Sequence, residues 1–266
     1  MKPASIIEKI FMLSADTMFS IIPRRVPDRE SLMQCKVVAH RGDHDNNNKI
    51  LENTIPAFDR VLENSIWGFE FDIRWTSDLK PVVFHDADLM RLFDSPLKIK
   101  DLTFDQIKKD FPLIPSLEEV IHKYGNKLHI FAEIKEEIYP DPALQNNMLK
   151  ELFASLEPVK DYHILSLCPD MFKVINFAPE HSFIPVAETN MRDMSELALS
   201  NDFGGVCGHY LFVTDDILRK HHKKGQGAGT GYASSANCLF REMNRGVDWI
   251  FSNNAVEIQG ILNQLM

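Results

Sequence analysis

Two carboxylates separated by a single residue lie in an apolar, β-rich run at residues 68–74, Gly-Phe-Glu-Phe-Asp-Ile-Arg. Successive side chains of a strand point to opposite faces, so Glu70 and Asp72 share one face and lie about 7 Å apart. The apolar side chains Phe69, Phe71 and Ile73 share the other face. Unpaired charges inside a protein are very costly. The acidic pair therefore needs a counter-ion, which is either a divalent cation with oxygen ligands or an Arg or Lys side chain.

A second run, Leu-His-Ile-Phe-Ala-Glu-Ile-Lys at residues 128–135, repeats this alternation. Its outward face is apolar, whereas Glu133 and Lys135 lie on the inward face together with His129 and Phe131. Two interpretations stay open at this point. Glu133 and Lys135 form an internal ion pair, or Glu133 is a third metal ligand beside an ammonium group that binds phosphate.

Two histidines stand at matching places after short β-rich runs. His40 follows residues 37–39 and precedes Arg41-Gly42, and His85 ends the run at residues 81–85 and precedes Asp86. A single histidine in such a place usually has a structural role. Two of them at strand ends, beside three inward carboxylates, suit a general acid and a general base.

The elements that must position these residues alternate between strands and helices, which predicts parallel β-α units. Helices are expected over residues 54–64 and 116–123. If the strand at 81–85 is an excursion from the second barrel strand, eight strands remain, and they predict an α/β fold of the TIM-type (β/α)8 barrel with a short insertion after the second barrel strand. A doubly wound sheet is the alternative. The expected strands cover residues 37–39, 68–74, 81–85, 128–134, 163–167, 183–186, 205–207, 227–230 and 247–251.

The composition argues against several classes of function. The 266 residues include 29 basic and 38 acidic side chains, which gives a formal charge of −9. An acidic chain without a basic face is not expected to bind nucleic acid. Its four cysteines form no C-x-x-C pair, which argues against a zinc ribbon or a redox motif and favours reduced thiols in the cytoplasm. The scattered cysteines are Cys35, Cys168, Cys207 and Cys238.

The chain is expected to divide into an N-terminal helical extension, residues 1–34, that packs on the barrel, and a barrel domain, residues 35–266. Apolar residues from Ile7 to Ile22 recur at helical spacing, and Glu8 and Lys9 interrupt what would otherwise be the apolar part of a signal peptide. Contact of this helix with a membrane surface or a partner is the alternative, and the protein would then be peripheral to a membrane. The sequence does not indicate an oligomeric state.

Five motifs occur in order at close spacing: His-Arg-Gly at 40–42, Glu-Asn-Thr-Ile-Pro-Ala-Phe at 52–58, Gly-Phe-Glu-Phe-Asp at 68–72, Pro-Val-Val-Phe-His-Asp at 81–86 and Glu-Ile-Lys at 133–135. Together they resemble the glycerophosphodiester phosphodiesterase family, over the chain from about residue 36 to the end. The resemblance implies a TIM-type barrel with an insertion at about residues 87–111. It also implies metal-dependent hydrolysis of glycerophosphodiesters to sn-glycerol 3-phosphate and an alcohol.

The resemblance assigns roles by position. The family's ligands for one divalent cation, Ca²⁺ or Mg²⁺, match Glu70, Asp72 and Glu133. Its catalytic pair matches His40 and His85, with His40 expected as the base and His85 as the acid. The attacking oxygen belongs either to water or to the 2-hydroxyl of the glycerol. The remaining matches are Arg41 and Lys135 as phosphate-binding residues and Glu52 as a supporting residue.

One motif departs from the family. Where members have a strand end like Trp-Thr-Val-Asn, this chain has Gly-Thr-Gly-Tyr at 229–232. The indole that the resemblance implies as a wall of the glycerol pocket is therefore missing, and Tyr232 is a candidate to shape that pocket. This difference keeps two alternatives in view: a phospholipase D-like enzyme that acts on lysophospholipids or sphingolipids, and a non-catalytic barrel that binds a phosphodiester.

Overall fold

Eight parallel strands form a closed barrel in the computed structural model, which describes residues 17–46 and 50–266. The barrel closes because β1 pairs in parallel with both β2 and β9, so that Val38 lies opposite Gly68 on one side and Phe251 on the other. A doubly wound sheet has two edges, so the closure confirms the predicted TIM-type barrel. The barrel strands are β1 (Val37–Ala39), β2 (Gly68–Trp75), β4 (His129–Ile134), β5 (Tyr162–Ser166), β6 (Phe183–Ala187), β7 (Gly205–His209), β8 (Gly227–Gly231) and β9 (Trp249–Ser252).

The remaining strand, β3 (Pro81–Val83), pairs antiparallel with the end of β2 and opens the insertion. The insertion continues through α4 (Met90–Phe93), a 3₁₀ turn at Ile99–Asp101 and α5 (Phe104–Asp110). This segment has its own apolar core, which holds it against the barrel. The buried members of that core are Val82, Phe84, Leu89, Ile99, Leu102, Ile107 and Ile114.

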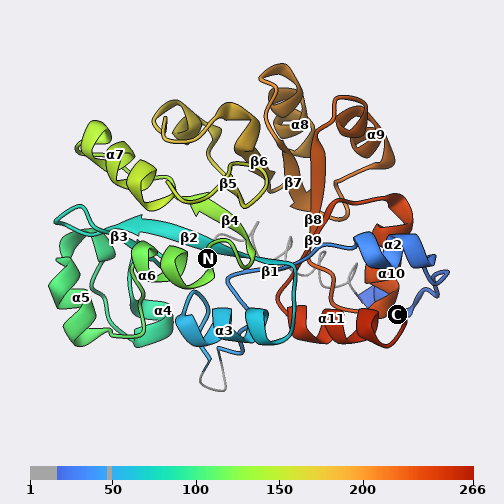
Figure 1. Cartoon of the computed structure of the whole chain (residues 1–266), viewed down its shortest axis with the longest axis horizontal. Coiled ribbons are helices and arrows are strands. Elements are labelled where there is room, and N and C mark those ends of the chain that lie inside the picture. The colour runs from blue at the N-terminus through green and yellow to red at the C-terminus, as the bar shows by residue number, and fades with distance from the viewer. Residues whose placement is uncertain (1–16, 47–49) are drawn as a thin grey trace.

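Helices surround the strands, with α3 and α11 along one side and α7, α8 and α9 along the other (Figure 1). The expected helices at 54–64 and 116–123 correspond to α3 and α6, and Ser116 and Glu119 form a capping box that starts α6. The remaining helical elements have these bounds: α2 (Arg29–Gln34), α3 (Ile55–Glu63), α6 (Leu117–Tyr124), α7 (Pro142–Leu152), α8 (Met191–Ser200), α9 (Asp215–Lys223), α10 (Ala236–Arg245), α11 (Ala255–Asn263) and 3₁₀ turns at Pro169–Lys173 and Glu180–Ser182.

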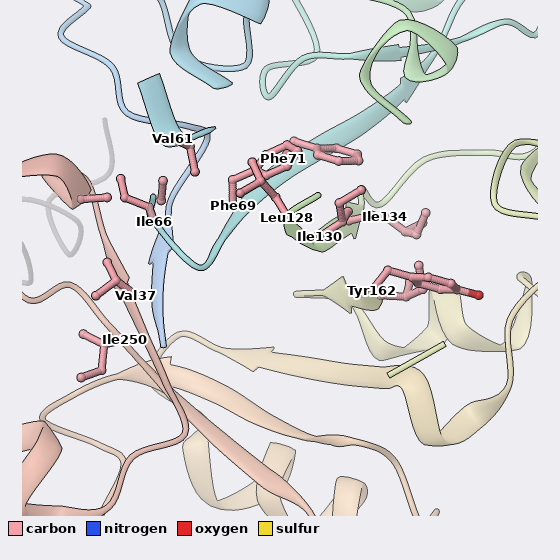
Figure 2. Packing of buried hydrophobic residues seen from close by; sticks show 14 of the residues in the cluster. Val37, Val61, Ile66, Phe69, Phe71, Leu128, Ile130, Ile134, Tyr162 and Ile250 are labelled. Atoms are coloured by element: carbon pink, nitrogen blue, oxygen red, sulfur yellow. The ribbon is translucent and has the colours of Figure 1, made fainter. Parts of the chain in front are cut away.

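The alternation of side chains along β2 and β4 separates two apolar layers. Phe69 and Phe71 face outward, where the ring of Phe69 lies 4.6 Å from that of Phe58 on α3. Figure 2 shows both phenylalanines beside Ile130 of β4 in this outer layer. Phe131 belongs instead to the cluster inside the barrel. The inward face of the two strands therefore carries Glu70, Asp72 and Glu133, with Phe131 as an apolar neighbour on β4, as the alternation predicts.

Part of the N-terminal extension packs on α10 and on Tyr210, which directly follows β7. Phe19 meets Tyr210 edge to face at 5.6 Å, and the Asn237 side chain donates to the Ser20 carbonyl at 2.6 Å. Ile7 and the rest of residues 1–16 lie outside the described residues, so the packing of the whole extension stays a prediction. In the part of the chain that the structure describes, no helix has the length and apolar character needed to cross a membrane.

Candidate active site

Three carboxylates meet inside the barrel on the neighbouring strands β2 and β4. Asp72 lies opposite Glu133 in the strand register, and Glu70 precedes Asp72 by two residues on the same face. One oxygen from each of the three lies within 4.8 Å of the others, and all three residues are buried. Glu70 Oε1 has no hydrogen-bond partner among the described residues. This all-oxygen donor set fits a hard divalent cation such as Ca²⁺ or Mg²⁺.

The three carboxylates differ in how strongly their surroundings favour the ionised form. Burial, together with the nearby charges of Asp72 and Glu133, raises the pKa of Glu70 well above its usual range. Burial also opposes ionisation of Asp72, but Lys135 and Arg41 outweigh it and lower the pKa of Asp72. The cations of the protein therefore compensate part of the cluster and leave Glu70 short of positive charge. An additional cation would remove this deficit.

Lys135 is an internal counter-ion of this cluster. Its Nζ lies 2.6 Å from Asp72 Oδ1 and also contacts Glu133. Burial favours the neutral amine, yet the two carboxylates raise the pKa of Lys135, so the side chain stays an ammonium. The ion pair considered from the sequence is thus present, and it keeps a positive charge next to the three carboxylates.

His40 is held in one tautomer by Asn253. Its Nδ1 lies 2.7 Å from the amide oxygen of Asn253, which can only accept, so Nδ1 carries the proton and Nε2 presents a lone pair. That Nε2 lies 3.9 Å from Glu70 Oε2. Burial, with a further contribution from the Arg41 charge, lowers the pKa of His40 to about 3. The environment of His40 therefore favours a neutral imidazole.

His85 is held through the same ring atom but by a carboxylate. Its Nδ1 lies 2.7 Å from Asp86 Oδ1, so the Nδ1 proton is donated to Asp86 and Nε2 is the free end. Burial outweighs the raising effects of Asp72 and of the hydrogen bond to Asp86, so the pKa of His85 is lowered. Because a carboxylate partner stabilises an imidazolium and an amide does not, the two histidines differ in their tendency to carry a proton.

Arg41 connects the histidine loop to the carboxylates. Its backbone N–H donates to Glu70 Oε2 at 3.0 Å, and its Nη1 donates to Glu52 Oε1 at 2.9 Å. Its Nε lies 3.5 Å from Asp72 Oδ2. Burial raises the pKa of Glu52, but hydrogen bonds from Arg91 and the charge of Arg41 outweigh it and leave the pKa at about 2. The structure thus places Glu52 against Arg41 as an ionised partner.

The structure brings all eight predicted site residues into one network, and it adds others. The sequence did not indicate a role for Asn253 or Arg91, because each contacts a residue that is distant in the sequence. Tyr232 contacts His40, with ring centroids 4.7 Å apart and its hydroxyl 3.4 Å from Nε2. Two more lay inside the recognised motifs without an assigned role: Asp86, and Asn53, whose Nδ2 donates to Asp72 Oδ2 at 2.7 Å.

Comparison with known proteins gives a consistent result. The model of the Glycerophosphoryl diester phosphodiesterase family matches residues 40–255. The chain is 35% identical over 132 residues to a glycerophosphodiester phosphodiesterase of Caldanaerobacter subterraneus subsp. tengcongensis, and 34% identical over 143 residues to glycerophosphodiester phosphodiesterase 1 of Bos taurus. These matches cover 45% and 46% of this chain, and 53% and 41% of the relatives. The chain thus spans about half the length of the curated relatives it matches.

Solved structures share the fold. A glycerophosphodiester phosphodiesterase from Parabacteroides distasonis aligns with a TM-score of 0.71 at 22% identity, over 87% of this chain and 98% of that one. An Oleispira antarctica phosphodiesterase in complex with the product sn-glycerol-3-phosphate aligns with a TM-score of 0.67 at 19% identity, over 86% of this chain and 96% of that one. At these identities the likeness shows the barrel fold.

Proposed function

Because the chain belongs to the glycerophosphoryl diester phosphodiesterase family, we propose that it hydrolyses glycerophosphodiesters to sn-glycerol 3-phosphate and an alcohol. One observation carries the proposal: three buried carboxylates with oxygens within 4.8 Å of one another lie beside two histidines, each held through Nδ1. Metal ligands, phosphate-binding cations and two proton-transfer groups are the parts that this reaction needs.

Glu70, Asp72 and Glu133 would hold one divalent cation, Ca²⁺ or Mg²⁺. When bound, such an ion polarises a phosphoryl oxygen and lowers the pKa of an oxygen nucleophile. The three ionised carboxylates carry a charge of −3, and a bound divalent cation would reduce it to −1. This remaining negative charge would repel a phosphodiester anion. Arg41 and Lys135 bring the total to +1. The fork of Arg41 suits two phosphate oxygens, and Lys135 contributes a point charge.

The hydrogen-bond partners of the two histidines support one assignment of the proton transfers. His40 accepts a proton at Nε2 from the attacking hydroxyl, which belongs either to water or to the glycerol 2-position. In the second case the alcohol leaves with formation of a cyclic phosphate, and water must then open the ring to give glycerol 3-phosphate. His85 donates a proton from Nε2 to the departing alcohol oxygen as its bond to phosphorus breaks. Burial favours an unprotonated base at His40, whose partner Asn253 adds no charge, whereas the hydrogen bond to the Asp86 carboxylate favours a proton on His85. Each transfer contributes about 10²–10⁴ in rate.

The test is release of glycerol 3-phosphate from glycerophosphocholine by the purified full chain, with Ca²⁺, with Mg²⁺ and with EDTA. We expect release with at least one of the two ions, no release with EDTA, and a loss of at least about a hundredfold in His40→Ala. His122→Ala is the matched control, because His122 is an exposed histidine of α6. This control should keep the activity of the wild type.

Two outcomes would redirect the proposal. Cleavage of a lysophospholipid without cleavage of glycerophosphocholine would assign the protein to the lipid-directed alternative, with Tyr232 as part of a different pocket wall. Binding of metal and of glycerol 3-phosphate without hydrolysis of either substrate would show a non-catalytic barrel. Release that is unaffected by EDTA would contradict the assigned role of the three carboxylates.

A further inference from the structure

Arg91 lies outside the recognised motifs, on α4 of the insertion, and contacts two carboxylates of the site. Its Nη1 and Nη2 donate to the two oxygens of Glu52 at 2.9 and 2.5 Å. Its Nε donates to Asp86 Oδ2 at 2.7 Å. The planar guanidinium thus binds Glu52 as a fork through its two Nη atoms and binds Asp86 through its Nε–H.

Each of these carboxylates holds a group assigned to the reaction. Asp86 accepts from His85 through its other oxygen, at 2.7 Å, and Glu52 accepts from Arg41 at 2.9 Å. We propose that Arg91 is a positioning residue that locks His85 through Asp86 and, at the same time, shares Glu52 with Arg41. This inference rests on the proposed function, since it assigns Arg91 to the same site.

The effect on His85 follows from geometry. Asp86 is only partly buried, and its carboxylate can rotate about its side-chain bond. With one oxygen bound to Arg91 and the other to His85, the carboxylate is fixed at both ends, and so is the direction of the His85 ring. Without Arg91, Asp86 loses one of these two contacts, and the free Nε2 of His85 would no longer be held toward a leaving group.

The effect on Arg41 follows from charge. If Arg91 were absent, Arg41 would be the cation paired with the buried Glu52, and a bidentate Arg–carboxylate pair would be its most favourable arrangement. Such a pair would compete with a phosphate for the same guanidinium. By occupying both oxygens of Glu52, Arg91 keeps part of the Arg41 guanidinium available. A lysine at this position has one point charge and no fork, so it could not hold both carboxylates in the same way.

The test uses Arg91→Gln and two substrates that differ in the leaving group. Choline is a poor leaving group and needs the proton from His85, whereas p-nitrophenolate leaves without one. On glycerophosphocholine we expect kcat to fall at least about tenfold, as part of the 10²–10⁴ that a general acid contributes. On the p-nitrophenyl ester of glycerol phosphate kcat should fall less than about threefold, while KM rises for both substrates because Arg41 is less available.

Arg219→Gln is the matched control, because Arg219 is an exposed arginine of α9 that pairs only with Asp216 among the contacts of the described residues. It should leave kcat and KM unchanged. An equal loss of kcat on both substrates in Arg91→Gln, or no loss, would overturn the inference.

A second measurement does not depend on activity. The Nδ1 proton of His85 in its hydrogen bond to Asp86 should give a downfield imidazole NMR resonance, to be assigned by its absence in His85→Gln. We expect this resonance to be lost or broadened in Arg91→Gln and unchanged in Arg219→Gln. An unchanged resonance in Arg91→Gln would overturn the positioning role. A wild-type protein that hydrolyses neither substrate would contradict the proposed function, and the resonance alone would then decide on Arg91.

Discussion

At the scale of single residues, the proton on Nδ1 decides what each histidine can do. Burial keeps His40 neutral, and the amide oxygen of Asn253 fixes the proton on Nδ1 without adding a charge. In Asn253→Asp, a carboxylate would favour the imidazolium and raise the pKa of His40. The base would then be lost at a higher pH, so the acidic limb of the profile of kcat/KM against pH should move up by about one to three units. If the acidic limb of Asn253→Asp lies at the same pH as that of the wild type, His40 is not the base.

Among the three proposed metal ligands, Glu70 is the one whose charge the protein compensates least. Because the pKa of Glu70 is raised, Glu70→Gln removes an unfavourable buried charge from the metal-free protein. Its melting temperature in EDTA should therefore equal or exceed that of the wild type. Loss of a residue that only supports a metal ligand lowers metal affinity about 10–100-fold. Because Glu70 is a proposed ligand itself, the affinity of Glu70→Gln for Ca²⁺ or Mg²⁺ should fall by more than this. Calorimetric titration with each ion measures this, and an unchanged affinity would remove Glu70 from the ligand set.

At the scale of elements, the insertion acts as a support for the site. Leu89 is fully buried in the core of the insertion and immediately precedes α4, which carries Arg91. Leu89→Ala should lower the free energy of unfolding by about 2–5 kcal/mol. It should also reproduce, in weaker form, the dependence of Arg91→Gln on the leaving group, because the packing that places α4 is loosened.

The control for this element is Leu239→Ala, which creates a cavity under α10 in the apolar layer between the helices and the barrel. It should destabilise the protein by a similar amount without changing the ratio of kcat between the two substrates. Urea unfolding and the two kinetic assays measure both effects. If both alanine variants change that ratio alike, the insertion has no separate part in positioning the acid.

At the scale of the whole molecule, a pair of buried histidines ties stability to pH. His129 Nδ1 donates to the Lys160 carbonyl at 2.9 Å, and its Nε2 accepts from His163 Nδ1 at 2.8 Å. Burial lowers the pKa of His129 from 6.5 to about 4. Well above pH 6.5 His129 is neutral in both the folded and the unfolded chain, so it does not change the free energy of unfolding with pH. As the pH falls toward 4 the unfolded chain binds the proton first, so stability falls by up to about 3 kcal/mol.

His129→Gln should therefore make the free energy of unfolding less dependent on pH in this window. The measurement is urea unfolding at several pH values in EDTA, so that metal binding does not contribute. His122→Ala serves again as the control and should keep the slope of the wild type. Equal slopes in His129→Gln and the wild type would show that the buried pair is not the origin of the effect.

Much of the site could be predicted from local patterns in the sequence. Alternation along a strand determines that Glu70 and Asp72 face inward while Phe69 and Phe71 face the helices. Repeated β-α units determine that neighbouring strands are parallel, which brings Glu133 beside Asp72. The eight strands and the excursion at β3 were predictable for the same reason, although strand ends differ by one or two residues. The insertion beyond β3 was expected only from the family resemblance.

Contacts between distant segments were decided only by the tertiary structure. Asn253 is 213 positions from His40, and Arg91 is 39 positions from Glu52, so no local pattern relates them. Burial then sets the protonation states, because the cost of a charge depends on how many partners surround it once water is removed. The order of residues thus determines which groups the site contains, whereas closure of the barrel decides which of them pair and which imidazole nitrogen carries the proton.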